Sequence, residues 1–196
     1  MYLYGASGHA KVIIEILEAC GVAVEGLFDD NEALSELQGY TVSRYDAACE
    51  ADKIISIGNN AIRKAIAERI GGRFGIAVHP SAILSPRAKV GEGTVIMQGA
   101  IVQADAQIGK HAIVNTGAKV DHECNIGDYA HISPGATLCG NVSVGEGTQI
   151  GAGAVVVPGV RIGKWSLICA GSVVTKDIPD NCIASGNRCE IVKYIK

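Results

Sequence analysis

The sequence predicts an α/β, Rossmann-like N-terminal domain over residues 1–75, followed by an all-β parallel helix of short strands over residues 76–196. Three observations support this prediction. Strand and helix patterns alternate in the first 75 residues, and a strict six-residue repeat occupies most of the remainder. Aromatic residues make up only 5% of the chain while there are 25 glycines, which favours a regular, thin-walled core of aliphatic side chains.

The N-terminal domain is expected to be a small parallel sheet with helices between its strands. Strands are predicted at residues 2–4, 24–28 and 53–57, with helices at residues 11–20 and after Asn60. Between the first strand and the first helix lies the turn Gly5-Ala6-Ser7-Gly8-His9-Ala10. Such a turn can point backbone N–H groups and a helix N-terminus at a phosphate, although a plain tight turn has the same pattern.

The repeat is defined by an aliphatic residue at every sixth position from Val78 to Val174. The lead residues are Val78, Leu84, Val90, Ile96, Val102, Ile108, Val114, Val120, Ile126, Ile132, Leu138, Val144, Ile150, Val156, Ile162, Ile168 and Val174. The fifth position of each hexad is small or β-branched, so both positions should face inward. Proline at the third position and glycine at the fourth are typical of tight corners with positive φ. Three strands and three corners would make a triangular coil of about eighteen residues.

Charge and cysteine usage exclude several classes of protein. The net charge of −3 gives no basic surface for nucleic acid, so no nucleic-acid partner is expected. No apolar run reaches the length of a membrane span and the N-terminus lacks a signal-peptide pattern, so we expect a soluble, cytoplasmic protein without a membrane partner. Seven scattered cysteines without a C-x-x-C pair favour reduced thiols and no metal site.

The hexad pattern resembles that of the hexapeptide-repeat family of left-handed β-helices, most of which are trimeric acyltransferases. The motifs Y-G-A-S-G-H-A, L-F-D-D and I-G-N-N-x-I-R-K, followed by N-T-x-A-x-V-x-H-E-C-x-I-G-D-Y-x-H, extend the similarity to almost the whole chain. Together they resemble the sialic acid O-acetyltransferase-like family, including the UDP-4-amino-sugar N-acetyltransferases of bacillosamine synthesis. The resemblance implies a homotrimer that transfers acetyl from acetyl-CoA to the 4-amino group of a nucleotide-linked, UDP-type amino-deoxysugar.

Catalytic candidates come from the hexad register and from the resemblance. His122 and Glu123 occupy the third and fourth positions of a corner, where a glutamate with positive φ is locally costly. A histidine is a natural base for freeing an amine nucleophile. A neighbouring carboxylate would strengthen that base, and the resemblance implies this role for Glu123. It also implies an oxyanion-binding backbone N–H at Gly140, one coil above His122.

Binding candidates are divided between the two substrates. For the nucleotide sugar, the resemblance implies Ser7, Gly8, His9, Asp29, Asp30 and Gly58, and Asn115 is a further candidate. His131 matches the family histidine that contacts acetyl-CoA. Ala152 and Ala170, one coil apart, could form a narrow track for the pantetheine arm. Arg161, Lys164 and Lys176 could meet phosphates or form a solvated basic rim.

Three alternatives remain at this point. An O-acetyltransferase acting on sialic acid or a related sugar would use the same fold, and so would a non-catalytic scaffold that binds nucleotide sugars. A γ-type carbonic anhydrase would need His111, His122 and His131 as zinc ligands, but these lack the close spacing of that family. The chain also departs from the family's G-x-P-A-K segment, with Gly186-Asn187-Arg188-Cys189-Glu190 in its place, which leaves the C-terminal cofactor contacts open.

Overall fold

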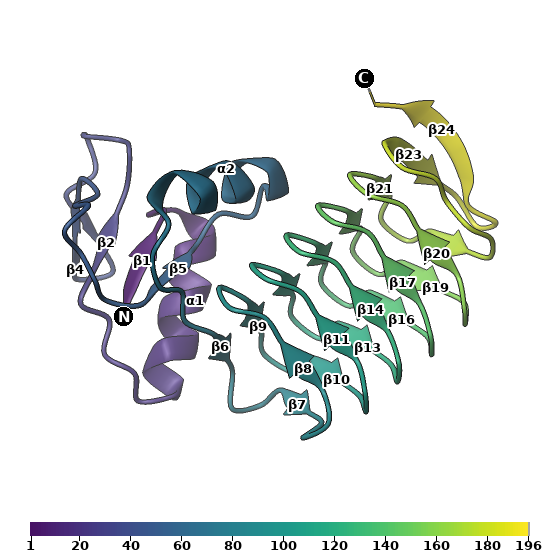
Figure 1. The fold of residues 1–196 in the computed structure, drawn as a ribbon, viewed down its shortest axis with the longest axis horizontal. Coiled ribbons are helices and arrows are strands. Elements are labelled where there is room, and N and C mark those ends of the chain that lie inside the picture. Colours follow the sequence, from purple (N-terminus) through teal and green to yellow (C-terminus); the bar gives the residue numbers. More distant parts are fainter. Residues whose placement is uncertain (196) are drawn as a thin grey trace.

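The N-terminal part of the computed structural model, which describes residues 1–195, is a five-stranded sheet with two helices (Figure 1). The sheet order is β3-β4-β2-β1-β5, parallel except for β3 at the edge, which pairs antiparallel with β4. The elements are β1 (Tyr2–Tyr4), α1 (Gly8–Ala19), β2 (Gly26–Phe28), β3 (Glu36–Leu37), β4 (Tyr40–Ser43), β5 (Lys53–Ile55) and α2 (Asn60–Ile70). This arrangement confirms the predicted parallel α/β unit and adds two strands, β3 and β4, that the sequence analysis missed.

Helix α1 begins three residues earlier than the sequence pattern predicted. Ser7 is its N-cap residue, in extended conformation, although its side chain makes no capping hydrogen bond. Serine is a favoured residue at this position because its side-chain oxygen can accept a hydrogen bond from a free N–H of the first turn. The expected start at Lys11 was wrong because apolar periodicity marks only the buried face, and the first turn of α1 is largely exposed.

The repeat folds as predicted, into a left-handed parallel β-helix with a two-residue strand at every lead position (Figure 1). Its first face contains β6 (Ala77–Val78), β9 (Val95–Ile96), β12 (Ile113–Val114), β15 (His131–Ile132), β18 (Gln149–Ile150) and β21 (Leu167–Ile168). The second contains β7 (Ile83–Leu84), β10 (Ile101–Val102), β13 (Lys119–Val120), β16 (Thr137–Leu138), β19 (Val155–Val156) and β22 (Val173–Val174). The third contains β8 (Lys89–Val90), β11 (Gln107–Ile108), β14 (Asn125–Ile126), β17 (Ser143–Val144) and β20 (Arg161–Ile162).

The three faces meet at three edges, formed by the third and fourth positions of the hexads. We call the edge between the first and second faces the first edge, that between the second and third the second edge, and that between the third and first the third edge. Each edge therefore lies opposite one face of the triangular coil. From Gly93 to Gly171, every fourth-position residue has positive φ, whether or not it is a glycine.

The core of the β-helix is a column of small and aliphatic side chains. From Ile96 to Val174 the lead residues are at most 3% exposed, and the fifth-position residues Ala100, Ala118 and Ala136 are fully buried. Small residues beside the corners allow successive coils to stack without a clash. The lead residues Val78, Leu84 and Val90 are only partly buried, because the first coil is the open end of the column.

The N-terminal part packs on the first face and third edge of the β-helix. Apolar side chains of α1, including Ile13 and Leu17, share a buried cluster with Val95, Met97 and Ile113 of the first face. At the C-terminal end of α1, the Cys20 thiol donates to the carbonyl of Val78. Helix α1 therefore runs along the first coils, with its N-terminus directed toward the later ones (Figure 1).

The C-terminal segment closes the far end of the column. After the last repeat, β23 (Cys182–Ser185) extends the first face and pairs in parallel with β21. Strand β24 (Glu190–Tyr194) then pairs antiparallel with β23. Arg188, where the chain departs from the family pattern, lies in the turn between them with φ of +67°.

Candidate active site

His122 and Glu123 form a polar pair on the second edge. His122 Nδ1 lies 3.1 Å from Glu123 Oε2, and the His122 backbone N–H donates to Asp121 Oδ1 at 2.8 Å. Because a carboxylate can only accept, this contact places the hydrogen of a neutral imidazole on Nδ1 and leaves Nε2 as the basic nitrogen. The side chains are 57% and 66% exposed, so the pair faces outward on a single chain.

Gly140 lies directly against the His122 ring. A Cβ atom added to Gly140 would lie 2.5 Å from His122 Cε1 and 2.6 Å from Nε2, so any side chain there would displace the ring. Within residues 1–195 the N–H of Gly140 donates no hydrogen bond, although the residue is buried. A basic nitrogen and an unused backbone donor therefore lie side by side, one coil apart.

The positive φ of Glu123, +58°, agrees with the strain expected from its position. Tyr129 and Trp165 share this conformation, with φ of +58° and +53°. Both lie on the third edge, beneath Lys64 of α2. The Lys64 Nζ atom is 5.9 Å from the ring centroid of Tyr129 and 5.4 Å from that of Trp165. Fourth-position residues other than glycine occur on the second edge too, but those with rings, His111, Tyr129 and Trp165, all lie on this third edge.

A second cluster lies on the first face, where the N-terminal part meets the β-helix. Asn115 Nδ2 lies 3.0 Å from His131 Nε2, and His131 is only 9% exposed. The backbone of Gly58, at the end of β5, and the side chain of His9, in the first turn of α1, lie close enough to His131 to influence its protonation. Residues proposed for the nucleotide sugar therefore lie together with the histidine proposed for acetyl-CoA.

The histidines of this cluster are held neutral. Burial lowers the pKa of His131 to about 3 and that of His9 to about 4, and the charge of Arg63 acts in the same direction on both. His131 Nδ1 and His9 Nε2 are buried and have no hydrogen-bond partner within residues 1–195. Buried polar atoms without partners are uncommon and call for an explanation. A ligand bound where the N-terminal part meets the first face, which we call the crease, would supply such partners.

The N-terminus of α1 borders this cluster. Ser7 and Gly8 are exposed, and an added Cβ at Gly8 would meet nothing within 4 Å, so the approach to the first turn is open. The glycine that the turn requires is Gly5, which has φ of +108° and would bring a Cβ to 2.7 Å from Ile57 Cγ1. The free N–H groups of the first turn make this end suitable for an anion.

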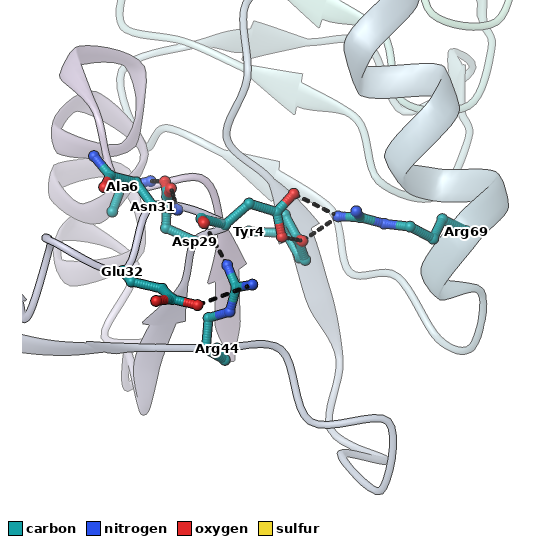
Figure 2. A network of polar contacts seen from close by, with 8 residues as sticks. Tyr4, Ala6, Asp29, Asn31, Glu32, Arg44 and Arg69 are labelled. Atoms are coloured by element: carbon teal, nitrogen blue, oxygen red, sulfur yellow. Dashed lines mark hydrogen bonds and ion pairs between the residues drawn. The ribbon is translucent and has the colours of Figure 1, made fainter.

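Asp29 and Asp30 belong to a polar network at the carboxyl ends of β1 and β2 (Figure 2). Asp29 accepts from the backbone N–H of Ala6 at 2.7 Å and of Asn31 at 2.8 Å, so it holds the glycine turn against the loop after β2. Asp30 accepts from the Tyr4 hydroxyl at 2.6 Å and pairs with Arg69 at 2.9 Å. These two contacts, the hydroxyl first, lower the pKa of Asp30 below its usual value.

The remaining candidate residues lie on different edges and faces of the β-helix and do not form one site within a single chain. Ala152 and Ala170 are exposed on the first edge, one coil apart, with Gly171 N–H donating to the Ala152 carbonyl. Arg161 is on the third face and Lys164 on the third edge. Lys176 is on the second edge, where its ammonium pairs with Glu190 at 2.6 Å. The three cations therefore do not gather into one phosphate site.

The two candidate groups lie on opposite sides of the column. The second edge, with His122 and Gly140, is opposite the first face, which holds His131 and Asn115. A cavity of about 200 Å³ on the second face, lined in part by Gln103, Asp121 and Cys139, adjoins the His122 edge. The core of the β-helix separates the two groups, so one chain cannot place them in one site.

The histidines do not assemble a metal centre within the chain. His111 is on the third edge, 3% exposed, and stacks on Tyr129 with ring centroids 5.2 Å apart. His122 and His131 lie on another edge and on a face. Across residues 1–195, no three His, Cys, Asp or Glu side chains are close enough together to hold a metal ion.

None of the helices in this part of the chain has the length and hydrophobicity to cross a lipid bilayer.

Comparison with known proteins bears directly on this arrangement. Residues 1–70 match the PglD N-terminal domain, and residues 123–156 and 141–176 match the bacterial transferase hexapeptide (six repeats). The structure of PerB from Caulobacter crescentus, in complex with CoA and GDP-perosamine, is 39% identical, with a TM-score of 0.93 over 98% of this chain and 96% of that one. The chain belongs to this family of sugar N-acetyltransferases.

Two further relatives show the range of the family. The acetyltransferase domain of PglB from Neisseria gonorrhoeae, in complex with acetyl coenzyme A, is 34% identical, with a TM-score of 0.91 over 97% of this chain and 98% of that one. UDP-N-acetylbacillosamine N-acetyltransferase from Bacillus subtilis is 44% identical over an alignment of 108 residues, and the match covers 48% of this chain and 50% of that protein. The match therefore spans about half the length of this curated relative.

Proposed function

We propose that the protein transfers the acetyl group of acetyl-CoA to the 4-amino group of a nucleotide-linked amino-deoxysugar. The observation that carries the proposal is the second edge, where His122 Nε2 lies beside the unused N–H of Gly140. Acyl transfer to an amine needs a base for the nucleophile and a donor for the oxyanion, and this edge offers both on two successive coils. The relatives that bind CoA together with an amino-sugar nucleotide support the choice of substrates.

The roles of the residues follow from their geometry. Glu123 accepts from Nδ1, which orients the ring and directs Nε2 to the proton of the attacking amine. As the sugar nitrogen bonds to the thioester carbon, the carbonyl oxygen gains negative charge and accepts from Gly140 N–H. The carbon–sulfur bond then breaks, the CoA sulfur takes the proton from His122, and an amide and free CoA are released.

Binding is divided between the two parts of the chain. We assign the nucleotide sugar to Ser7, Gly8 and His9 at the open end of α1, with Gly58 beside them. Asp29 and Asp30 contribute by shaping the adjacent loops. Asn115 and His131 line the same crease, and the exposed Ala152 and Ala170 give an acyl-carrier arm a path without side chains in the way.

The complete site requires more than one copy of the chain, so we propose a homotrimer with sites between neighbours. His122 lies opposite the first face of its own column, whereas the second edge of one copy can approach the first face of the next. Outward-facing residues of the second face include Ile83, which is 63% exposed, Ile101 and Val155. Such a flat apolar surface suits self-association.

A substrate panel tests the proposal. Purified protein is incubated with acetyl-CoA and UDP-, GDP- or CMP-linked 4-amino sugars, or free sialic acid, and thiol release is measured together with the mass of the product. We expect an increase of 42 Da, which defines an acetyl group, on the amine of one nucleotide sugar. Acetylation of a sugar hydroxyl would identify an O-acetyltransferase instead. Binding of nucleotide sugars without any thiol release would identify a non-catalytic scaffold.

A further inference from the structure

Arg63 is a cation buried between the two parts of the molecule, with only 1% of the residue exposed. All five of its N–H groups are used. Nε donates to the His111 carbonyl at 2.8 Å, Nη1 to the carbonyls of Ile57 at 2.9 Å and Gly58 at 3.1 Å, and Nη2 to Asn60 Oδ1 and the Tyr129 carbonyl, both at 2.8 Å. The side chain therefore joins the loop after β5, the start of α2 and two consecutive coils of the third edge.

Burying a cation in this way has a high desolvation cost, so fold stability alone is a poor explanation for Arg63. Arg63 forms no ion pair with any carboxylate of residues 1–195, so its charge is balanced only by carbonyl and amide oxygens. Burying a charge costs several kcal/mol, and apolar residues of similar volume often stabilise a core at least as well. A guanidinium offers what an apolar residue cannot, which is a planar fork that fixes several acceptors at defined angles.

Four of the five acceptors are backbone carbonyls, and the loop that carries one of them, Gly58, forms one wall of the cluster around His131. Gly58, one acceptor, lies beside His131 on the first face. His111 and Tyr129 are eighteen residues apart, on successive coils, and Tyr129 is two residues before His131. Asn60 continues the link, since its Nδ2 donates to the Gly147 carbonyl one coil further on, at 3.0 Å. The Arg63 guanidinium therefore fixes the position of the Gly58 loop along the axis of the β-helix.

We propose that Arg63 is a positioning residue for acetyl transfer, which aligns the Gly58 wall of the sugar-nucleotide site with the coil that presents His131. This inference rests on the proposed function. A shift of about 1 Å in a bound reactant can cost about 100-fold in rate while each substrate still binds. Loss of the fork should therefore reduce kcat more than it weakens the binding of CoA.

The key variants are Arg63→Lys, which keeps the charge but loses the fork, and Arg63→Met, which loses both. Lys53→Met is the matched control. Lys53 is also a cation at 1% exposure, and its ammonium donates only to backbone carbonyls, those of Cys49 at 3.1 Å and Ala51 at 3.2 Å. It lies at the opposite end of β5 from Gly58. All three variants should lower the melting temperature.

At saturating substrates and below the melting temperatures, we expect both Arg63 variants to lower kcat by about 10- to 100-fold. Their dissociation constants for CoA should stay within about twofold of wild type, and Lys53→Met should keep its kcat. Wild-type kcat in Arg63→Lys, with only a lower melting temperature, would overturn the proposal. Failure of both Arg63 variants to fold would also overturn it, because the residue would then serve the fold alone.

Hydrogen exchange of the free protein separates this inference from the proposed function. Two hydrogen-bonded amides flank the Gly58 loop, that of Ser56, which donates to the Tyr4 carbonyl, and that of Ile62, which donates to Asn59 Oδ1. Both should exchange at least tenfold faster in Arg63→Lys than in Lys53→Met, because only the former releases the Gly58 loop. Unchanged exchange would overturn the positioning role even if kcat fell. If wild-type protein acetylates no sugar in the panel, the proposed function fails, while the exchange experiment still decides whether Arg63 fixes this wall.

Discussion

His122 and His131 are nine residues apart in sequence and occupy opposite physical environments. The His122 side chain is 57% exposed, on an edge, with a carboxylate at Nδ1 and a glycine against its ring. His131 is 9% exposed, on a face, close to an arginine, and its Nδ1 has no partner within residues 1–195. An exposed histidine with a carboxylate can exchange protons, whereas a buried one held neutral can only orient a ligand by hydrogen bonding.

The largest expected effect comes from the exposed histidine. His122→Ala should lower kcat by about 10²- to 10⁴-fold, because the amine loses its general base, with little change in acetyl-CoA affinity. Steady-state kinetics with both substrates saturating measures this. His79→Ala is the control, since the His79 side chain bonds only to Ser81, at the start of the repeat. A near wild-type kcat in His122→Ala, when chemistry limits the rate, would favour an amine that arrives already neutral.

Gly140→Ala should have the next largest effect, about 10- to 100-fold on kcat, because the added Cβ would displace the His122 ring. A double-mutant cycle with His122→Ala is the sharpest measurement. If the glycine acts through the histidine, adding Gly140→Ala to His122→Ala should change kcat by much less than the single substitution does. Fully multiplicative effects would instead assign Gly140 a role independent of the ring.

Mixed oligomers test whether the two environments meet between copies. His122→Ala and His131→Ala chains are co-refolded in equal amounts and assayed at sub-saturating acetyl-CoA, where the second variant should also be weak. If each site combines an edge of one copy with a face of the next, random mixing should restore about a quarter of wild-type activity. Activity equal to the mean of the two separate variants would show that each chain carries a complete site.

The last prediction concerns stability at acidic pH. His9 and His111 have folded-state pKa values of about 4 and His131 of about 3, below the ordinary value of 6.5, and burial is the main cause for each. The unfolded chain therefore binds more protons, so the free energy of unfolding should fall as the pH decreases from about 6.5 toward 4. Each histidine contributes at most about 1.4 kcal/mol per pH unit.

Urea unfolding at pH 7, 6 and 5, followed by Trp165 fluorescence, measures this slope. His131→Asn should flatten it, because one buried titrating group is removed. An unaltered slope in His131→Asn would contradict the buried, neutral state assigned to that histidine.

Much of the fold was determined by sequence alone, because the hexad repeat is a local rule. Each lead residue must face inward, and from Gly93 to Gly171 each fourth-position residue takes positive φ, so the strands and corners follow from spacing. The proximity of Gly140 to His122 follows from the same rule, since residues eighteen apart stack on one edge. Strands β3 and β4 were not predicted because they are only two and four residues long, too short for an alternating pattern to stand out.

Only the tertiary structure decided where the N-terminal part docks, and with it the environment of each histidine. No periodicity marks Arg63, whose five donors are satisfied by carbonyl and amide oxygens from three separate segments. The burial of His9 and His131 depends on the packing of α1 on the first face, which is a contact between residues distant in sequence. Local patterns specify strands and corners, but burial and pKa depend on what the completed fold places above them.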